Sequence, residues 1–195
     1  MVLEHTMDTQ TVKIILGVII LSALLGLETI RPFFRKREGR FVRVGGHLAL
    51  AALNTAITAA ILSLGGAAAI AWLSGRRGGG LASAVPVPTW GVFLFAVVAL
   101  DLWMYFWHRA NHEIYFLWRF HRAHHTDREL DVTSAFRFHP GEIFLSTSLR
   151  VLVLGALGLS LGKLAVYETA LLPVILFHHS NVAIPGALDR RLRSL

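Results

Sequence analysis

The sequence predicts an all-α fold, an integral membrane helical bundle with a cytosolic, histidine-rich helical cap. Of its 195 residues, 54% are hydrophobic and only 16% are charged, whereas soluble domains have about 25% charged residues. The hydrophobic residues gather in runs long enough to span a bilayer. Eight of the ten histidines lie between positions 108 and 179, which predicts one histidine-rich region.

The charge balance and the lack of cysteine exclude several classes of partner and of metal site. Nineteen Lys and Arg against twelve Asp and Glu give a net charge of +7. In a chain with a mean hydropathy of +0.57, we expect this excess in loops that meet an anionic membrane surface, and we expect no nucleic-acid partner. Without cysteine there is no disulfide, iron–sulfur cluster or thiolate-ligated metal. Histidine, carboxylate or backbone groups must hold any metal.

The first apolar run extends from Val12 to Ile30, with Lys13 and Glu28 near its ends. Long side chains at these places can snorkel toward the membrane surface. At about 1.5 Å per residue, the run is long enough to cross a hydrocarbon core of about 30 Å. A signal peptide is the competing interpretation, but no basic segment precedes the run, so we expect a retained span.

A basic linker, residues 31–46, separates this span from a second apolar run, Leu48 to Leu73. Gly65 and Gly66 interrupt the second run, and its many alanines allow close helix packing. We expect residues 75–88 to form a loop, because they contain Arg-Arg-Gly-Gly-Gly and two prolines.

The third run, Trp90 to Trp107, has tryptophan at both ends, as spans with interfacial aromatic belts do. The last apolar region, Ile143 to Phe177, is broken near Gly162 and Lys163. Each half has about seventeen residues, the lower limit for a full crossing. We therefore expect a membrane-embedded hairpin, either two short spans or a re-entrant pair.

Basic residues predict the orientation of this multi-pass chain. If the 31–46 linker is cytosolic, then residues 108–142 and the C-terminus are cytosolic too, and these regions hold 14 of the 19 basic residues. The opposite side keeps Lys13, Arg76, Arg77 and Lys163. The histidines are therefore expected on the cytosolic face.

Histidine spacing predicts metal binding. A spacing of four places His108 and His112 on one helix face. Spacings of three and four do the same for His121, His124 and His125. The step of nine positions from His112 to His121, at about 100° per residue, turns the second group to the opposite side of a straight helix. A shared site therefore requires a bend or break, expected around Tyr115 to Phe120, or two helices that face one cavity.

An acidic residue precedes this group inside the third run. Asp101, Tyr105, His108 and His112 form one helical stripe that leaves the membrane, and an intramembrane ionisable residue is a functional candidate. We expect Asp101 to accept a hydrogen bond from a metal-bound imidazole, with Tyr105 and Asn181 close by. The alternative is a carboxylate bonded to a neighbouring helix.

The remaining histidines are more dispersed. Arg137-Phe-His139-Pro140 and His178-His179-Ser-Asn181 carry further candidate ligands. Only one of the adjacent pair need point inward, and we choose His179. His5 and His47 are expected to be polar residues at the membrane surface.

Known metal scaffolds are excluded by their spacing. His112-Glu113 begins the zinc-protease pattern, but position 116 is Phe. No Glu is followed three residues later by His, so the di-iron bundle motif is absent. His139-Pro140-Gly141 resembles the start of a cytochrome b5 haem motif, but Glu142 replaces its second glycine.

The ordered motifs are similar to those of the fatty acid hydroxylase/sterol desaturase superfamily over roughly residues 90–185. The similarity rests on Asp101, Tyr105, His108-Arg109, His112, residues 117–125 (Leu-Trp-Arg-Phe-His-Arg-Ala-His-His) and residues 137–140 (Arg-Phe-His-Pro). It implies a fatty acid hydroxylase-like domain at residues 90–195, after an N-terminal transmembrane region at residues 1–89. The implied metal ligands are His108, His112, His121, His124, His125, His139 and His179.

The resemblance also implies a last H-x-x-H-H box after the His-Ser-Asn run, and no histidine follows His179 in this sequence. Two interpretations stay open: a fragment of a longer chain, or a truncated paralogue without catalytic activity. As written, the sequence is expected to hold at most one ion well.

By resemblance, the expected cofactor is a pair of non-haem iron ions that uses O2 to hydroxylate or desaturate a lipid. Electrons are expected from a separate electron-transfer protein. The arginine-rich cytosolic face, which includes Arg128, is a docking surface for an acidic donor, or reflects the positive-inside bias alone. A metal transporter or sensor, a bis-imidazole haem protein and a non-catalytic scaffold are the competing functions.

Overall fold

The computed structural model describes residues 2–35, 39–76, 80–81, 88–127 and 129–192. In these ranges it is helical, with a single isolated bridge between Pro32 and Val182 and no strand. The elements are α1 (Val2–Ile30), α2 (Arg40–Ile61), the π turn η1 (Leu62–Gly66), α3 (Ala67–Arg76), α5 (Thr89–Glu113), α6 (Tyr115–His125), the 3-10 turn η2 (Val132–Phe136), α7 (Pro140–Leu157), α8 (Leu161–His179) and α9 (Gly186–Leu192). Five segments of this part are long and apolar enough to cross a membrane. The predicted all-α membrane bundle is confirmed.

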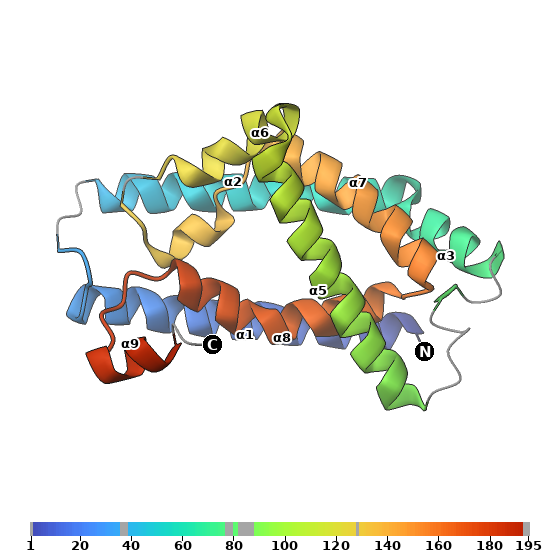
Figure 1. Cartoon of the computed structure of the whole chain (residues 1–195), viewed down its shortest axis with the longest axis horizontal. Coiled ribbons are helices and arrows are strands. Elements are labelled where there is room, and N and C mark those ends of the chain that lie inside the picture. Colours follow the sequence, from blue (N-terminus) through green and yellow to red (C-terminus); the bar gives the residue numbers. More distant parts are fainter. Residues whose placement is uncertain (1, 36–38, 77–79, 82–87, 128, 193–195) are drawn as a thin grey trace.

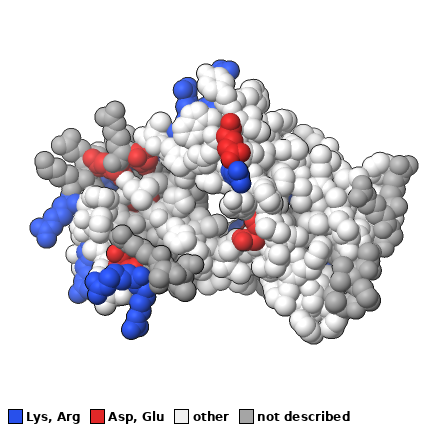
Figure 2. Space-filling view, in the orientation of Figure 1, with Lys and Arg blue, Asp and Glu red and all other residues white. Residues whose placement is uncertain are grey.

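The spans form two pairs of parallel helices. Helix α1 runs beside α8, and α2 runs beside α7, while α5 crosses in front of them diagonally (Figure 1). The turn η2 contacts α1, α2 and α8, so it connects the two pairs near the end at which α8 finishes. Charged side chains gather over the left half and the upper edge of the molecule, and the right half carries few (Figure 2).

Two apolar cores hold the pairs together. The larger core joins α3, α5, α7 and α8 through Ile70, Ala96, Leu100, Val151, Leu154, Leu159 and Tyr167. The smaller core joins α1 and α8 to η2 through Leu24, Val132, Ala135 and Leu176. The smaller core fixes η2 against α1 and α8.

The second span begins earlier than the sequence predicts. Helix α2 starts at Arg40, so Arg40 and Arg43 lie on a helix and not in a linker. The predicted interruption is a kink at Gly65, whose φ of 133° is open to glycine and rarely to other residues. Arg77 and Arg128 and the side chain of His5 lie outside the described residues, as does most of the predicted 75–88 loop.

The predicted hairpin is two helices of 18 and 19 residues. They are separated at residues 158–160, slightly before the predicted break. Gly158 adopts φ 72° and ends α7, and the Ser160 side chain accepts a hydrogen bond from the Lys163 backbone N–H and caps α8. These two local signals determine the turn.

Glu28 and His47 are buried, and the prediction of membrane-surface positions for them is wrong. Glu28 is 1% exposed, and its Oε1 accepts hydrogen bonds from the Val132 and Asn181 backbone N–H groups at 2.7 Å each. His47 is 4% exposed, and its Nδ1 lies 2.8 Å from Thr133 Oγ1. The cause is η2, which turns into the bundle and brings its own polar groups against α1 and α2.

Candidate metal centre

A break between α5 and α6 brings the histidine groups together. Ile114 has extended dihedral angles, φ −93° and ψ 112°, and separates the last residue of α5 from the first of α6. The predicted break therefore exists, one residue before the expected range. Because the chain changes direction here, α6 turns its first histidine back toward α5.

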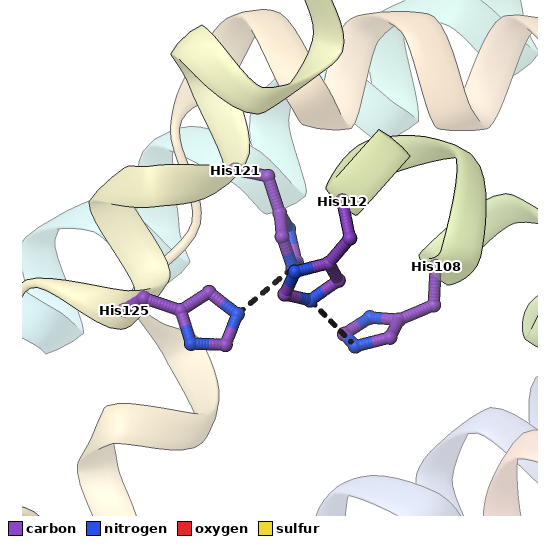
Figure 3. A group of neighbouring side chains, drawn as sticks. All are labelled: His108, His112, His121 and His125. Carbon is purple, nitrogen blue, oxygen red and sulfur yellow. Dashed lines mark hydrogen bonds between the residues drawn. The ribbon is translucent and has the colours of Figure 1, made fainter. Parts of the chain in front are cut away.

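Four side chains converge across the break (Figure 3). We call His108, His112, His121 and His125 the four-histidine cluster. One ring nitrogen from each lies within 4.8 Å of the others. Within each helix the Nε2 atoms are 3.2 Å apart, from His108 to His112 and from His121 to His125. This is an arrangement in which four imidazoles can share one ion.

A buried carboxylate orients the central member of the cluster. His121 is 1% exposed, and its Nδ1 lies 2.9 Å from Oε1 of Glu142, which is 5% exposed. The imidazole donates its Nδ1–H to the carboxylate, so its Nε2 lone pair faces the other rings. Carboxylates behind ligating histidines fix ring orientation and raise basicity in this way.

Sequence reasoning missed Glu142, although a signal was present. It is the acidic residue of α7, in the first turn after His139-Pro140. An acid at the start of an apolar helix, next to a candidate ligand, is itself a functional candidate.

Replacing Glu142 by alanine is expected to weaken divalent metal binding by about 10- to 100-fold, because the His121 ring loses its anchor. Glu142→Gln keeps an acceptor oxygen and is expected to retain more affinity. Chelator competition with Zn²⁺ or Fe²⁺ measures both. Glu129→Gln, which changes a carboxylate paired with Arg43, is the control. Equal affinity of wild type and Glu142→Ala would show that this hydrogen bond does not support the site.

A second pair of histidines lies beside the cluster. His124 Nε2 is 3.2 Å from His179 Nε2, and His179 Nδ1 donates to the Ile175 carbonyl at 2.7 Å. Burial, and then the neighbouring His179, His125 and His121, lower the pKa of His124 to about 4. The ring is therefore neutral at pH 7 and has a lone pair for a metal. His178, by contrast, is exposed beside Phe177.

Aromatic rings pack against both groups of histidines. Trp118 lies over the cluster, with ring centroids 5.4 Å from His112 and 5.7 Å from His125. Phe138 stacks on His124 at 4.7 Å with an interplanar angle of 7°. Among the four histidines of the cluster, His121 is buried and the other three are exposed. For His125, burial and the neighbouring His121 and His112 rings lower the pKa as well.

His139 does not join the other candidate ligands in the described part of the chain. Its Nδ1 accepts a hydrogen bond from the Gly141 backbone N–H at 3.0 Å and caps α7. Its ring lies against Phe120, with centroids 5.1 Å apart. The His-Pro sequence thus starts a helix here.

The three expected supporting residues also have other partners. Asp101 accepts from the Tyr167 hydroxyl on α8 at 3.3 Å, which is the alternative that the sequence left open. Tyr105 is 56% exposed, with its ring against Phe106. The Asn181 side chain pairs with the backbone N–H and carbonyl of Phe34 and fixes the α1–α2 connection. Among the described residues, the carboxylate that hydrogen-bonds a histidine of the cluster is that of Glu142, and not that of Asp101.

A cavity of about 580 Å³ lies between the two helix pairs. It is lined by residues of α1, α2, η2, α7 and α8, and Phe138 is among them. Phe138 therefore lines the cavity, and its ring stacks on His124. The volume is in the range of pockets that hold one small ligand.

The family of the chain follows from a comparison with models of known protein families. Searches of curated proteins and of solved structures found no match. The family model for fatty acid hydroxylases matches residues 93–194, more than half of the chain. The matched residues include the four-histidine cluster, the His124–His179 pair and Glu142. The chain belongs to the fatty acid hydroxylase family.

Proposed function

We propose that this integral membrane protein is a non-haem iron oxidoreductase that hydroxylates or desaturates a lipid with O2. Family membership supports a lipid hydroxylase or desaturase in general terms. The observation that carries the proposal is the convergence of four imidazole nitrogens at one point beside apolar spans.

The residues fit an iron ion at the four-histidine cluster. Neutral imidazole is a suitable ligand for iron, and Glu142 leaves the Nε2 of His121 free to bind. The second ion of a di-iron centre would use His124 and His179, whose ring nitrogens lie 3.2 Å apart. Among the described residues this second position has two imidazoles, so the cluster is the stronger site.

Bound iron would supply the redox chemistry with O2, and the chain's own residues would prepare the site for it. Glu142 holds the proton of His121 on Nδ1, and Trp118 and Phe138 pack against the histidine rings. We propose that the lipid occupies the cavity, which Phe138 lines. Positioning one C–H bond and excluding water are the protein's contribution in such enzymes.

The electron balance requires a donor. Hydroxylation places one oxygen atom of O2 in a C–H bond and reduces the other to water with two electrons and two protons. Desaturation removes two hydrogen atoms, and with the same two electrons and two protons both oxygen atoms become water. We propose that a separate electron-transfer protein supplies the electrons at the cytosolic face, where the positive-inside bias puts the histidines.

Mass spectrometry of membrane lipids tests the function. Membranes with the wild-type chain, iron, O2 and a reductant are expected to contain lipids that have gained one oxygen atom or lost two hydrogen atoms. His179→Ala is expected to reduce these products to the level of membranes without the protein. His178→Ala, which changes the adjacent exposed histidine, is the matched control and should retain them.

Two outcomes would contradict the proposal. One is a lipid profile that the wild-type chain does not change under any supply of iron and reductant. The other is a Soret band in the purified protein, which would indicate haem in place of non-haem iron.

A further inference from the structure

Three charged side chains from three spans meet at the wall of the cavity. The Lys13 ammonium on α1 bonds Oε2 of Glu168 on α8, and Arg150 Nη1 on α7 bonds Oε1 of the same carboxylate at 2.8 Å. All three residues line the cavity, and each side chain is 25–28% exposed. Charges inside a span are rare, and they mark sites of function more often than surface charges do.

This trio has more donors than acceptors. A lysine ammonium has three N–H groups and an arginine guanidinium five, and both Glu168 oxygens already accept from one of them. Among the described residues, the other terminal nitrogen of Arg150 contacts the weak acceptor Sδ of Met104, at 3.8 Å. Two cations against one carboxylate leave one positive charge. The missing partner is an anion with several oxygen atoms, a carboxylate or a phosphate.

The other end of the cavity has an unpaired acceptor. Asn54 is 8% exposed and lines the cavity, and its Nδ2 donates to the Phe138 carbonyl at 3.0 Å. Its Oδ1 is buried without a hydrogen-bond partner. Buried amide oxygens are rarely left unpaired. If the amide turned toward the cavity, a hydroxyl group of a bound molecule would satisfy this oxygen.

Hydroxyl-bearing side chains line the wall between the two ends. Thr55 and Thr58 lie on α2, and Ser146 and Thr147 on α7, among apolar residues. Ile143 and Arg150 both line the cavity, and seven residues of α7 correspond to about 10 Å. The cavity is therefore elongated, with a cationic end and an end near Phe138.

We infer that the cavity is a binding site for an anionic single-chain lipid. The acid group contacts Lys13 and Arg150, the chain extends toward Phe138, and a hydroxyl group on that part of the chain donates to Asn54. A volume of about 580 Å³ suits one such chain. Lys13 and Asn54 lie outside residues 93–194, so family membership does not assign this site.

The inference rests on the proposed function in one respect, that the bound lipid is the substrate. Phe138 lines the cavity and its ring stacks on His124, so the part of the lipid nearest the metal centre would be remote from the acid group. Binding energy at a remote charged group can position the reacting part of a substrate.

Equilibrium binding of radiolabelled oleate to the iron-free full chain in detergent tests the site. Wild type is expected to bind oleate at least about tenfold more tightly than oleyl alcohol, because the alcohol lacks the charge. Arg150→Gln and Lys13→Gln are each expected to remove most of this preference. Arg109→Gln, which changes an exposed arginine outside the cavity, should keep it. Competition by lysophosphatidate in place of oleate would identify the acid as a phosphate.

Asn54→Leu tests the other end without disturbing the ion pairs. Wild type is expected to prefer oleate with a hydroxyl in the distal half of its chain over plain oleate, and Asn54→Leu to bind both equally. Equal binding of oleate, lysophosphatidate and oleyl alcohol by wild type overturns the inference, as does an unchanged preference in both cation variants. The binding assay uses iron-free protein and therefore tests the site alone. Binding of oleate together with an unchanged lipid profile in the iron-loaded assay would preserve the site and contradict the proposed function instead.

Discussion

Replacing His121 by alanine is expected to abolish iron binding at the four-histidine cluster. His121 is the buried member, and its ring centroid lies 4.8–4.9 Å from those of His108, His112 and His125. The substitution removes a ligand and leaves the Glu142 carboxylate buried without its partner. Iron per chain, measured after loading and gel filtration in detergent, is expected to fall from a stoichiometric amount to near zero.

His178→Ala is the matched control, because it removes an exposed histidine that adjoins His179 in the chain. It should bind as much iron as wild type. Circular dichroism of both variants checks that the helices remain. A folded His121→Ala protein with the iron content of wild type would contradict the four-histidine site.

Replacing Glu28 by alanine is expected to lower the free energy of unfolding by about 3–5 kcal/mol, the effect of removing one partner of a buried ion pair. The carboxylate accepts from the Val132 and Asn181 backbone N–H groups and pairs with Arg40 at 3.4 Å. Without it, these donors are buried without an acceptor. Val132, Asn181 and Arg40 come from three different segments of the chain. Loss of the carboxylate is therefore expected to loosen the packing of these segments against α1.

Chemical unfolding in detergent, followed by circular dichroism, measures this loss. Glu28→Gln keeps one acceptor oxygen and is expected to have an intermediate midpoint. Glu113→Ala removes an exposed carboxylate paired with Arg109 and should leave the midpoint unchanged. Identical midpoints for Glu28→Ala and Glu113→Ala would show that the buried network does not stabilise the fold.

Local patterns in the sequence predicted the apolar helices and the two groups of histidines on either side of a break. Apolar runs gave the spans, and the step of nine positions from His112 to His121 indicated the break that Ile114 provides. Spacing alone could not separate His124 from its neighbours. Adjacent residues on a helix point about 100° apart, so the cluster takes His125 and leaves His124 to face His179.

Contacts between distant segments were beyond the sequence patterns. Glu142 is 21 residues from His121, and Glu28 is 104 residues from Val132. Both pairs depend on how η2 and the start of α7 turn back into the bundle. Asp101 was the nearer acid along the helical stripe, but its hydrogen bond goes to Tyr167 on α8.

X-ray absorption at the iron edge of the iron-loaded protein tests the four-histidine site most directly. We expect a shell of nitrogen scatterers with the outer-shell pattern of several imidazole rings, and we expect His121→Ala to lose it. Iron bound by oxygen atoms alone, or an imidazole pattern that His121→Ala leaves unchanged, would contradict this site.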